Sequence, residues 1–164
     1  MNGRLGDVVA SVRHLPDRRG WLRVAAELLW AMPLLLLIAY AGGLARIVEP
    51  PDSATLLQLG ATLLVAPALG EELLFRAAII PRERPRWPWL AFSVVLFVAW
   101  HPLQVVTFGP PWAGAFLDPW FLFAVAVLGV ALARIYAVAG SIWPCVLAHW
   151  LVVFVWKVLL GGPF

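Results

Sequence analysis

The chain has 164 residues and a mass of 18.0 kDa, and 63% of its residues are hydrophobic while only 13% are charged. Because soluble globular domains carry about 25% charged residues, this composition excludes a water-soluble fold. The ten tryptophans and fourteen prolines are typical of a membrane protein, in which tryptophan gathers at the two interfaces. The single Cys145 excludes an internal disulfide framework. We therefore predict an all-α, polytopic membrane helix bundle.

The sequence pI is about 9.8, a value that basic nucleic-acid-binding proteins also reach. Here, however, the arginines lie at the ends of apolar segments, where membrane orientation places positive charge. We therefore expect the lipid bilayer, and no nucleic acid, as a partner.

Residues 1–22 are polar and basic and predict a cytoplasmic leader. A mostly apolar stretch that includes Glu27 follows, and it predicts the first membrane helix over residues 23–47. The alternative is a cleaved signal peptide that ends near the Ala39-Tyr40-Ala41 triplet. Both the leader and the apolar run are long for a signal peptide, so we expect an uncleaved helix.

Four further apolar stretches bring the predicted number of membrane helices to about five. They cover residues 54–80, 87–107, 119–140 and 141–160, and short connections rich in proline, glycine or charge separate most of them. No internal repeat is visible. We expect residues 54–160 to form a four-helix membrane core.

Lysine and arginine are concentrated in the leader and in the loop over residues 81–88. Under the positive-inside rule this asymmetry predicts a cytoplasmic amino terminus. Interfacial tryptophans agree with that orientation. Near the cytoplasmic face we expect Trp21, Trp87, Trp89 and Trp143, and near the other face Trp112, Trp120 and Trp156.

Five of the ionisable side chains inside the predicted membrane helices are candidate site residues, because each needs a partner or a function there. They are Glu71, Glu72, Arg76, His101 and His149. With a rise of about 1.5 Å per residue, both histidines and the first glutamate fall within roughly 12 to 20 Å of the same membrane face. We therefore expect those three side chains to meet in one pocket.

Glu72 and Arg76 are four residues apart with the acid first, the order that favours an ion pair on one helix face. Glu71 points about 100° away and has no local partner, which leaves it available as a general base. Gly70 leaves room for a neighbouring backbone or a substrate, and Pro67 predicts a bend in the helix. From these residue types alone, a purely structural ion network is the alternative.

Three motifs resemble a known family. Residues 71–76 read EExxxR, residues 97–101 read FxxxH, and His149 lies where a third motif, HxxxN, would begin. In this order they resemble the CPBP family, also called the CAAX protease and bacteriocin-processing or Abi family, whose members are glutamic-type intramembrane proteases. The resemblance covers roughly residues 54–160 and implies a catalytic four-helix core.

The resemblance implies that Glu71 and His101 activate a water, that His149 supplies an oxyanion donor, and that Glu72 and Arg76 support the site. The implied activity is hydrolysis of a peptide bond near the terminus of a membrane-associated protein or peptide, with no covalent intermediate and no cofactor. Relatives act on prenylated CAAX ends, on bacteriocin-type leader peptides, or on C-terminal sorting tags in myxosortase-like systems. The short chain favours the last two and a bacterial inner membrane.

One position departs from the family pattern, because Val153 stands where the third motif has asparagine. Losing one oxyanion donor costs about two to three orders of magnitude in rate in other enzymes. Lys157, one turn further along the helix, and Gln104, three residues after His101, are candidate replacement donors. Alternatively, Lys157 extends to the outer interface and Gln104 hydrogen-bonds within the bundle.

Other functions are also compatible with these residues. His101, His149 and Glu71 match the ligand set of catalytic zinc sites, although no HExxH motif is present. Cys145, one turn before His149, is an alternative nucleophile, but a lone buried cysteine is usually a packing residue. A non-enzymatic immunity or binding protein is favoured by Val153. A proton-relay transporter fits poorly with five spans and no repeat.

Overall fold

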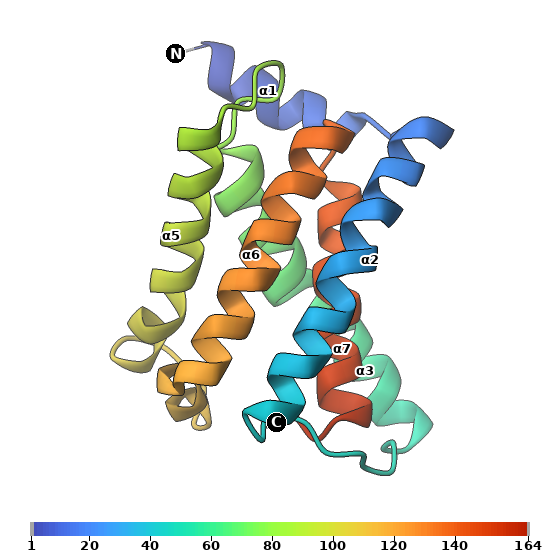
Figure 1. Ribbon diagram of the computed structural model, residues 1–164, viewed down its shortest axis with the longest axis vertical. Helices are drawn as coiled ribbons and strands as arrows, with labels where there is room; N and C mark the ends of the chain where they lie inside the picture. The colour runs from blue at the N-terminus through green and yellow to red at the C-terminus, as the bar shows by residue number, and fades with distance from the viewer. Residues whose placement is uncertain (1, 164) are drawn as a thin grey trace.

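The computed structural model describes residues 2–163, and its regular structure there is entirely helical. Figure 1 shows the long helices running along the long axis of the molecule, with the amino-terminal helix α1 lying across one end. In chain order the elements are α1 (Asn2–Arg13), α2 (Arg18–Ala41), α3 (Ser53–Leu63), η1 (Leu64–Leu69), α4 (Gly70–Glu72), η2 (Leu73–Ala77), α5 (Trp87–Val105), η3 (Ala113–Leu117), α6 (Pro119–Ala139) and α7 (Trp143–Leu159).

Within residues 2–163, four helical stretches are long and apolar enough to cross a membrane. They are Arg18–Ala41, Ser53–Ala77, Trp87–Val105 and Pro119–Ala139. Helix α7 is also apolar but has 17 residues, slightly fewer than a typical span. With α7 included, the bundle has about five membrane helices, and the chain is an integral membrane protein.

Aspartate side chains set where three of the long helices begin. Asp17 Oδ1 accepts a hydrogen bond from Gly20 N at 2.7 Å, and Asp52 and Asp118 accept from the first-turn amides of α3 and α6. Such side chains satisfy amide donors that have no partner inside the helix. Helix α2 therefore begins at Arg18, five residues earlier than the predicted start of the first membrane helix.

The predicted leader is more ordered than its polar composition indicated. Its first part forms α1, which lies across one end of the bundle (Figure 1) and is held there by hydrogen bonds. Arg4 Nη1 donates to Ile79 O at 2.6 Å, and Trp143 Nε1 donates to Val12 O at 2.8 Å. The sequence did not predict this helix, because its apolar residues are few and show no strong helical pattern.

The second membrane helix is irregular on both sides of the two glutamates. Pro67 lacks an amide hydrogen, and the chain around it takes the wider π-helical turns of η1. A second π-helical segment, η2, follows directly after Glu72. π-helical turns are rare and often occur at functional sites. Their position on both sides of Glu71 and Glu72 therefore indicates a functional site at these two residues. The predicted bend at Pro67 stays a prediction, and the structure shows a π-helical segment around that residue.

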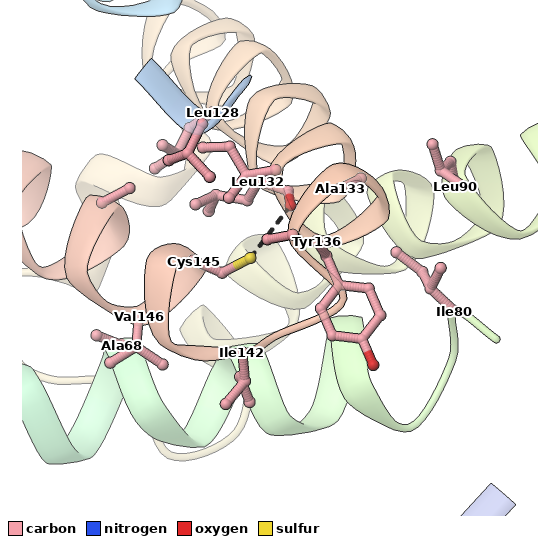
Figure 2. Close-up of a cluster of buried hydrophobic side chains, with 14 of the residues drawn as sticks. Ala68, Ile80, Leu90, Leu128, Leu132, Ala133, Tyr136, Ile142, Cys145 and Val146 are labelled. Carbon is pink, nitrogen blue, oxygen red and sulfur yellow. Dashed lines mark hydrogen bonds between the residues drawn. The ribbon is translucent and has the colours of Figure 1, made fainter. Parts of the chain in front are cut away.

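Helix α6 lies at the centre of the bundle and packs against α2, α5 and α7. One group of buried residues surrounds Leu132 and Tyr136, and Figure 2 shows Cys145 of α7 inserted there. A second, aromatic group lies between α5, η3 and α6 and includes Phe97. Gly129 allows the close approach of α6 to α5, because a Cβ there would lie only 3.1 Å from the Phe97 ring.

Candidate active site

A cavity of about 760 Å³ lies between the helices, and α2, α3, α5, α6 and α7 all contribute to its walls. Most of the lining is apolar. The ionisable and amide side chains that line it are Glu71, His101, Gln104, His149 and Lys157. The structure therefore brings both histidines and Glu71 to one cavity, as their depths in the membrane predicted.

Glu72 is fully buried and holds two partners. Arg76 Nε lies 3.2 Å from Glu72 Oε2, and neither side chain is exposed, so the predicted ion pair is confirmed. On the other side, His149 Nδ1 lies 2.9 Å from Glu72 Oε1. Because a carboxylate accepts hydrogen bonds, His149 Nδ1 carries the hydrogen. Glu72 therefore fixes the orientation of the His149 ring, a contact that the sequence did not predict.

Glu71 has one oxygen held and one oxygen available. Trp100 Nε1 donates to Glu71 Oε1 at 3.1 Å. Glu71 Oε2 is buried, makes no hydrogen bond to the described residues, and lies 3.9 Å from His149 Nε2. Sequence reasoning missed Trp100, although it directly precedes His101 in the second motif. The arrangement leaves a carboxylate oxygen that can accept a proton inside the cavity.

His101 is fixed by its own helix. Its Nδ1 lies 2.9 Å from Phe97 O, and since a carbonyl only accepts, Nδ1 is the donor. In the neutral ring Nε2 is then an acceptor. The side chain is buried and lines the cavity. His101 can therefore accept a hydrogen bond from a water or a substrate.

Phe97 is the aromatic residue of the second motif, and its ring packs against both histidines. The ring centroids lie 5.2 Å from His101 and 5.7 Å from His149, and the Arg76 guanidinium carbon lies 4.5 Å from the Phe97 ring centroid. One turn earlier, Ser93 Oγ accepts from Arg76 Nη1 at 3.2 Å and donates to Phe75 O. The sequence did not assign Ser93, although it is the one hydroxyl residue between Trp87 and His101.

The two candidate replacement donors line the same cavity. Gln104 is half-buried in its wall. The Lys157 side chain is buried, with its Nζ 4.0 Å from the Trp112 ring centroid and donating to Pro163 O. Lys157 therefore does not extend into the outer interface. Eight residues, or about 12 Å of helix, separate it from His149, so its assignment as an oxyanion donor stays a prediction.

The three residues of the zinc alternative line the cavity, whereas the cysteine of the other alternative does not. Cys145 does not line it, and its Sγ is directed to Leu132 O at 3.4 Å (Figure 2). Within residues 2–163, no three histidine, cysteine or carboxylate side chains are arranged to hold a metal ion. His101 and His149 use Nδ1 for Phe97 O and for Glu72, respectively.

A family model described as type II CAAX prenyl endopeptidase Rce1-like matches residues 52–155, which is more than half of the chain. The chain belongs to this family. The Rce1-like match confirms the resemblance that the three motifs indicated, and it contains all five ionisable residues of the predicted site. No curated protein and no solved structure matches the chain. As an Rce1-like protein with apolar helices, the chain is a membrane-embedded protease family member whose substrate is a protein.

Proposed function

We propose that this Rce1-like protein is an intramembrane endopeptidase that hydrolyses a peptide bond near the terminus of a membrane-associated protein or peptide. The observation that supports the proposal is the environment of the two carboxylate oxygens of Glu71. Trp100 holds one of these oxygens. The other is buried beside His149, in the same cavity as His101, and has no hydrogen bond to any residue that the structure describes. A water bound there meets a carboxylate acceptor in an apolar setting.

In the proposed reaction, Glu71 Oε2 accepts a proton from water while the water oxygen bonds to the carbonyl carbon of the substrate. His101 Nε2 is the second acceptor and orients the same water. The electron pair of the carbonyl double bond moves to its oxygen. Because Glu71 acts on water, no covalent bond to the enzyme forms.

We assign the stabilisation of the oxyanion to His149. Its Nδ1 is bound to Glu72, and its Nε2 faces the Glu71 side of the cavity. Because Nδ1 donates to Glu72, Nε2 donates to the oxyanion only when the ring carries a hydrogen on both nitrogens. The electron pair on the oxyanion then re-forms the carbonyl, the C–N bond breaks with its pair going to nitrogen, and the amine leaves with the proton held by Glu71. Val153 contributes no donor, so His149 carries this role, with Gln104 as the candidate second donor.

The substrates proposed from the family resemblance are leader peptides or C-terminal sorting tags of membrane-associated proteins, in a bacterial inner membrane with the amino terminus in the cytoplasm. The largely apolar cavity fits such hydrophobic segments. Figure 1 places α1 and the loop before α5 at the same end, which supports a common basic face.

The direct test is terminal peptide mapping of the host's membrane and surface proteins, comparing the native protein with Glu71→Gln at equal level. The amide keeps the acceptor for Trp100 but removes the base, so we expect specific new termini to disappear. Glu83→Gln, in the exposed loop after η2, is the matched control and keeps them. Unchanged termini in a folded Glu71→Gln protein would refute the protease assignment.

A second function is favoured by Val153, which removes the family's usual amide donor. In this alternative the protein is a non-enzymatic immunity or binding protein, and the chain from Arg76 through Glu72 to His149 holds helices together. It predicts that Glu71→Gln leaves every terminus unchanged while Glu72→Gln unfolds the protein. The same mapping experiment therefore separates the two functions.

A further inference from the structure

The cavity at the proposed active site lies in one part of the bundle. Helices α2, α5, α6 and α7 line it only with residues from the part of each helix that lies away from α1 (Figure 1). On α5 the lining residues begin at Phe97 and on α7 at His149, although these helices begin beside α1 at Trp87 and Trp143. Helix α6 runs the opposite way, and its lining residues end at Leu128. The cavity therefore extends from the two histidines toward the end of the molecule that carries η3.

Toward α1, the bundle is closed behind the two histidines. The side chains that fill this part are at most 1% exposed, and they include Arg76, Ser93, Leu132, Cys145 and Val146. The chain at and after α1 then covers this end of the bundle. Ser11 O accepts from Ile142 N at 3.2 Å, and His14 O accepts from Ser141 Oγ at 2.6 Å. The packing of the described residues therefore closes the α1 end to a peptide.

At the opposite end, the cavity reaches the surface of the protein. Phe108, in the loop after α5, lines the cavity and is 64% exposed. Leu36 of α2 lines it as well and is 46% exposed, so the opening continues toward the lipid in the same part of the bundle. Hydrolysis requires water at Glu71 as well as a peptide. Because the α1 end is closed, both enter from the end that carries η3.

The distribution of charge indicates on which side of the membrane this opening lies. Arginines gather at the α1 end, in α1, at the start of α2 and in the loop before α5, and they include Arg4, Arg13, Arg18, Arg19, Arg82, Arg84 and Arg86. Arg46 lies at the opposite end, together with the aspartates that begin α3 and α6. Under the positive-inside rule, the α1 end is cytoplasmic and the opening is on the other side.

We propose that the active site takes its substrate from the non-cytoplasmic side of the membrane, so that the cleaved segment belongs to an exported part of a membrane-associated protein. A substrate whose scissile bond stays in the cytoplasm does not reach Glu71. This inference rests on the proposed function and on its orientation. It adds the side of entry, which the family match does not give.

The test is the side from which a charged reagent reaches the cavity. Cys145 is the single cysteine, so a Cys145→Ala background reports only the cysteine that is introduced. Val153→Cys lies on the cavity wall one turn after His149, and Gln104→Cys lies on the facing wall from α5. Each full-length variant is treated with an impermeant methanethiosulfonate in intact bacterial cells and in inside-out membrane vesicles, and modification is read as a mass shift. We expect both cysteines to be modified in intact cells and modification to be lost in inside-out vesicles.

Val95→Cys is the matched control on α5. Val95 is 64% exposed but does not line the cavity, so it faces lipid and stays unmodified from either side. Modification of a cavity cysteine therefore reports access through the cavity and not exposure alone. Gly3→Cys, at the α1 end, is modified in the inside-out vesicles and shows that the reagent is active there.

Modification of the cavity cysteines in inside-out vesicles overturns the proposal, and so does a folded variant that stays unmodified in intact cells. The two positions lie on different helices, so the test remains available if one variant does not fold. Terminal peptide mapping with Glu71→Gln tests the function separately. Modification from outside with unchanged termini retains the route and refutes the peptidase. Loss of termini with modification only from the cytoplasmic side retains the peptidase and refutes the route.

Discussion

At the level of single residues, Trp100 fixes the orientation of the Glu71 carboxylate. Its indole N–H donates to Oε1, so the carboxylate is held in one orientation and its other oxygen stays available. The indole also packs against Phe75, with ring centroids 6.0 Å apart. In the proposed mechanism Trp100 is therefore a positioning residue, which acts through Glu71, the side chain that it holds.

Replacing Trp100 with phenylalanine tests this role. The ring is kept but its donor is lost, so Glu71 is no longer held, and we expect kcat to fall about tenfold with KM unchanged. Steady-state kinetics on a cleaved peptide measures both parameters. Trp87→Phe is the control, because Trp87 is 69% exposed at the start of α5. An unchanged kcat in Trp100→Phe contradicts the positioning role.

At the level of elements, α2 is joined to α6 by an ion pair that the sequence did not predict. Arg134 Nε and Nη2 donate to Glu27 at 2.7 and 2.9 Å, and Trp30 Nε1 donates to the same carboxylate at 2.8 Å. The forked geometry matches an arginine to a carboxylate. Helix α2 lies outside the family match, yet Met32 and Leu35 line the cavity, so this pair holds one wall of the site.

Removing one partner of this pair is expected to destabilise the protein. Glu27→Gln leaves the Arg134 charge without its carboxylate. Because the Arg134 side chain is 41% exposed, we expect the free energy of unfolding to fall by about 1–2 kcal/mol, which is less than for a fully buried pair. Equilibrium unfolding in mixed micelles measures it. In a double-mutant cycle with Arg134→Gln, a coupling energy near zero contradicts the pairing.

Asp52, the residue before α3, makes a pH-dependent contribution to the stability of the fold and lies outside the membrane helices. Backbone and side-chain hydrogen bonds from Thr55 lower the pKa of Asp52 below its usual range. A lowered pKa stabilises the folded state above the ordinary value of about 3.9, and this contribution is lost as pH falls through the lowered pKa.

We therefore expect Asp52→Asn to unfold about 1–2 °C below the native protein at pH 7, because the neutral cap interacts less with the helix dipole. The difference shrinks as the pH is lowered below about 4. Thermal unfolding of both proteins between pH 7 and pH 3 measures it. A difference that persists undiminished at pH 3 contradicts the role of the ionised cap.

At the level of the whole molecule, the proposed orientation can be tested with two glycines at opposite ends. A Cβ at Gly3 or at Gly114 meets no neighbouring atom within 4 Å, so a cysteine fits at either position. In a Cys145→Ala background, we expect an impermeant maleimide to label Gly114→Cys in intact bacterial cells. Gly3→Cys is labelled only after the cells are permeabilised. The reverse pattern places the amino terminus outside.

The amino-acid sequence alone determined the features that depend on local spacing. Composition predicted a membrane helix bundle, and the four-residue spacing of Glu72 and Arg76 predicted their ion pair, because residues one helical turn apart lie side by side. Depth counted along each helix brought Glu71, His101 and His149 to one level. The three motifs then indicated the family, which the match over residues 52–155 confirmed.

Only the tertiary structure decided which side chains meet across helices. It showed that His149 hydrogen-bonds to Glu72, which is 77 residues away in sequence. It also showed that Trp100 donates to Glu71 and that Arg134 donates to Glu27. Helical periodicity places residues along and around one axis, but it does not fix how far each helix is rotated about that axis toward its neighbours. That rotation is set by the packing of all the helices together, so cross-helix partners follow from the assembled bundle.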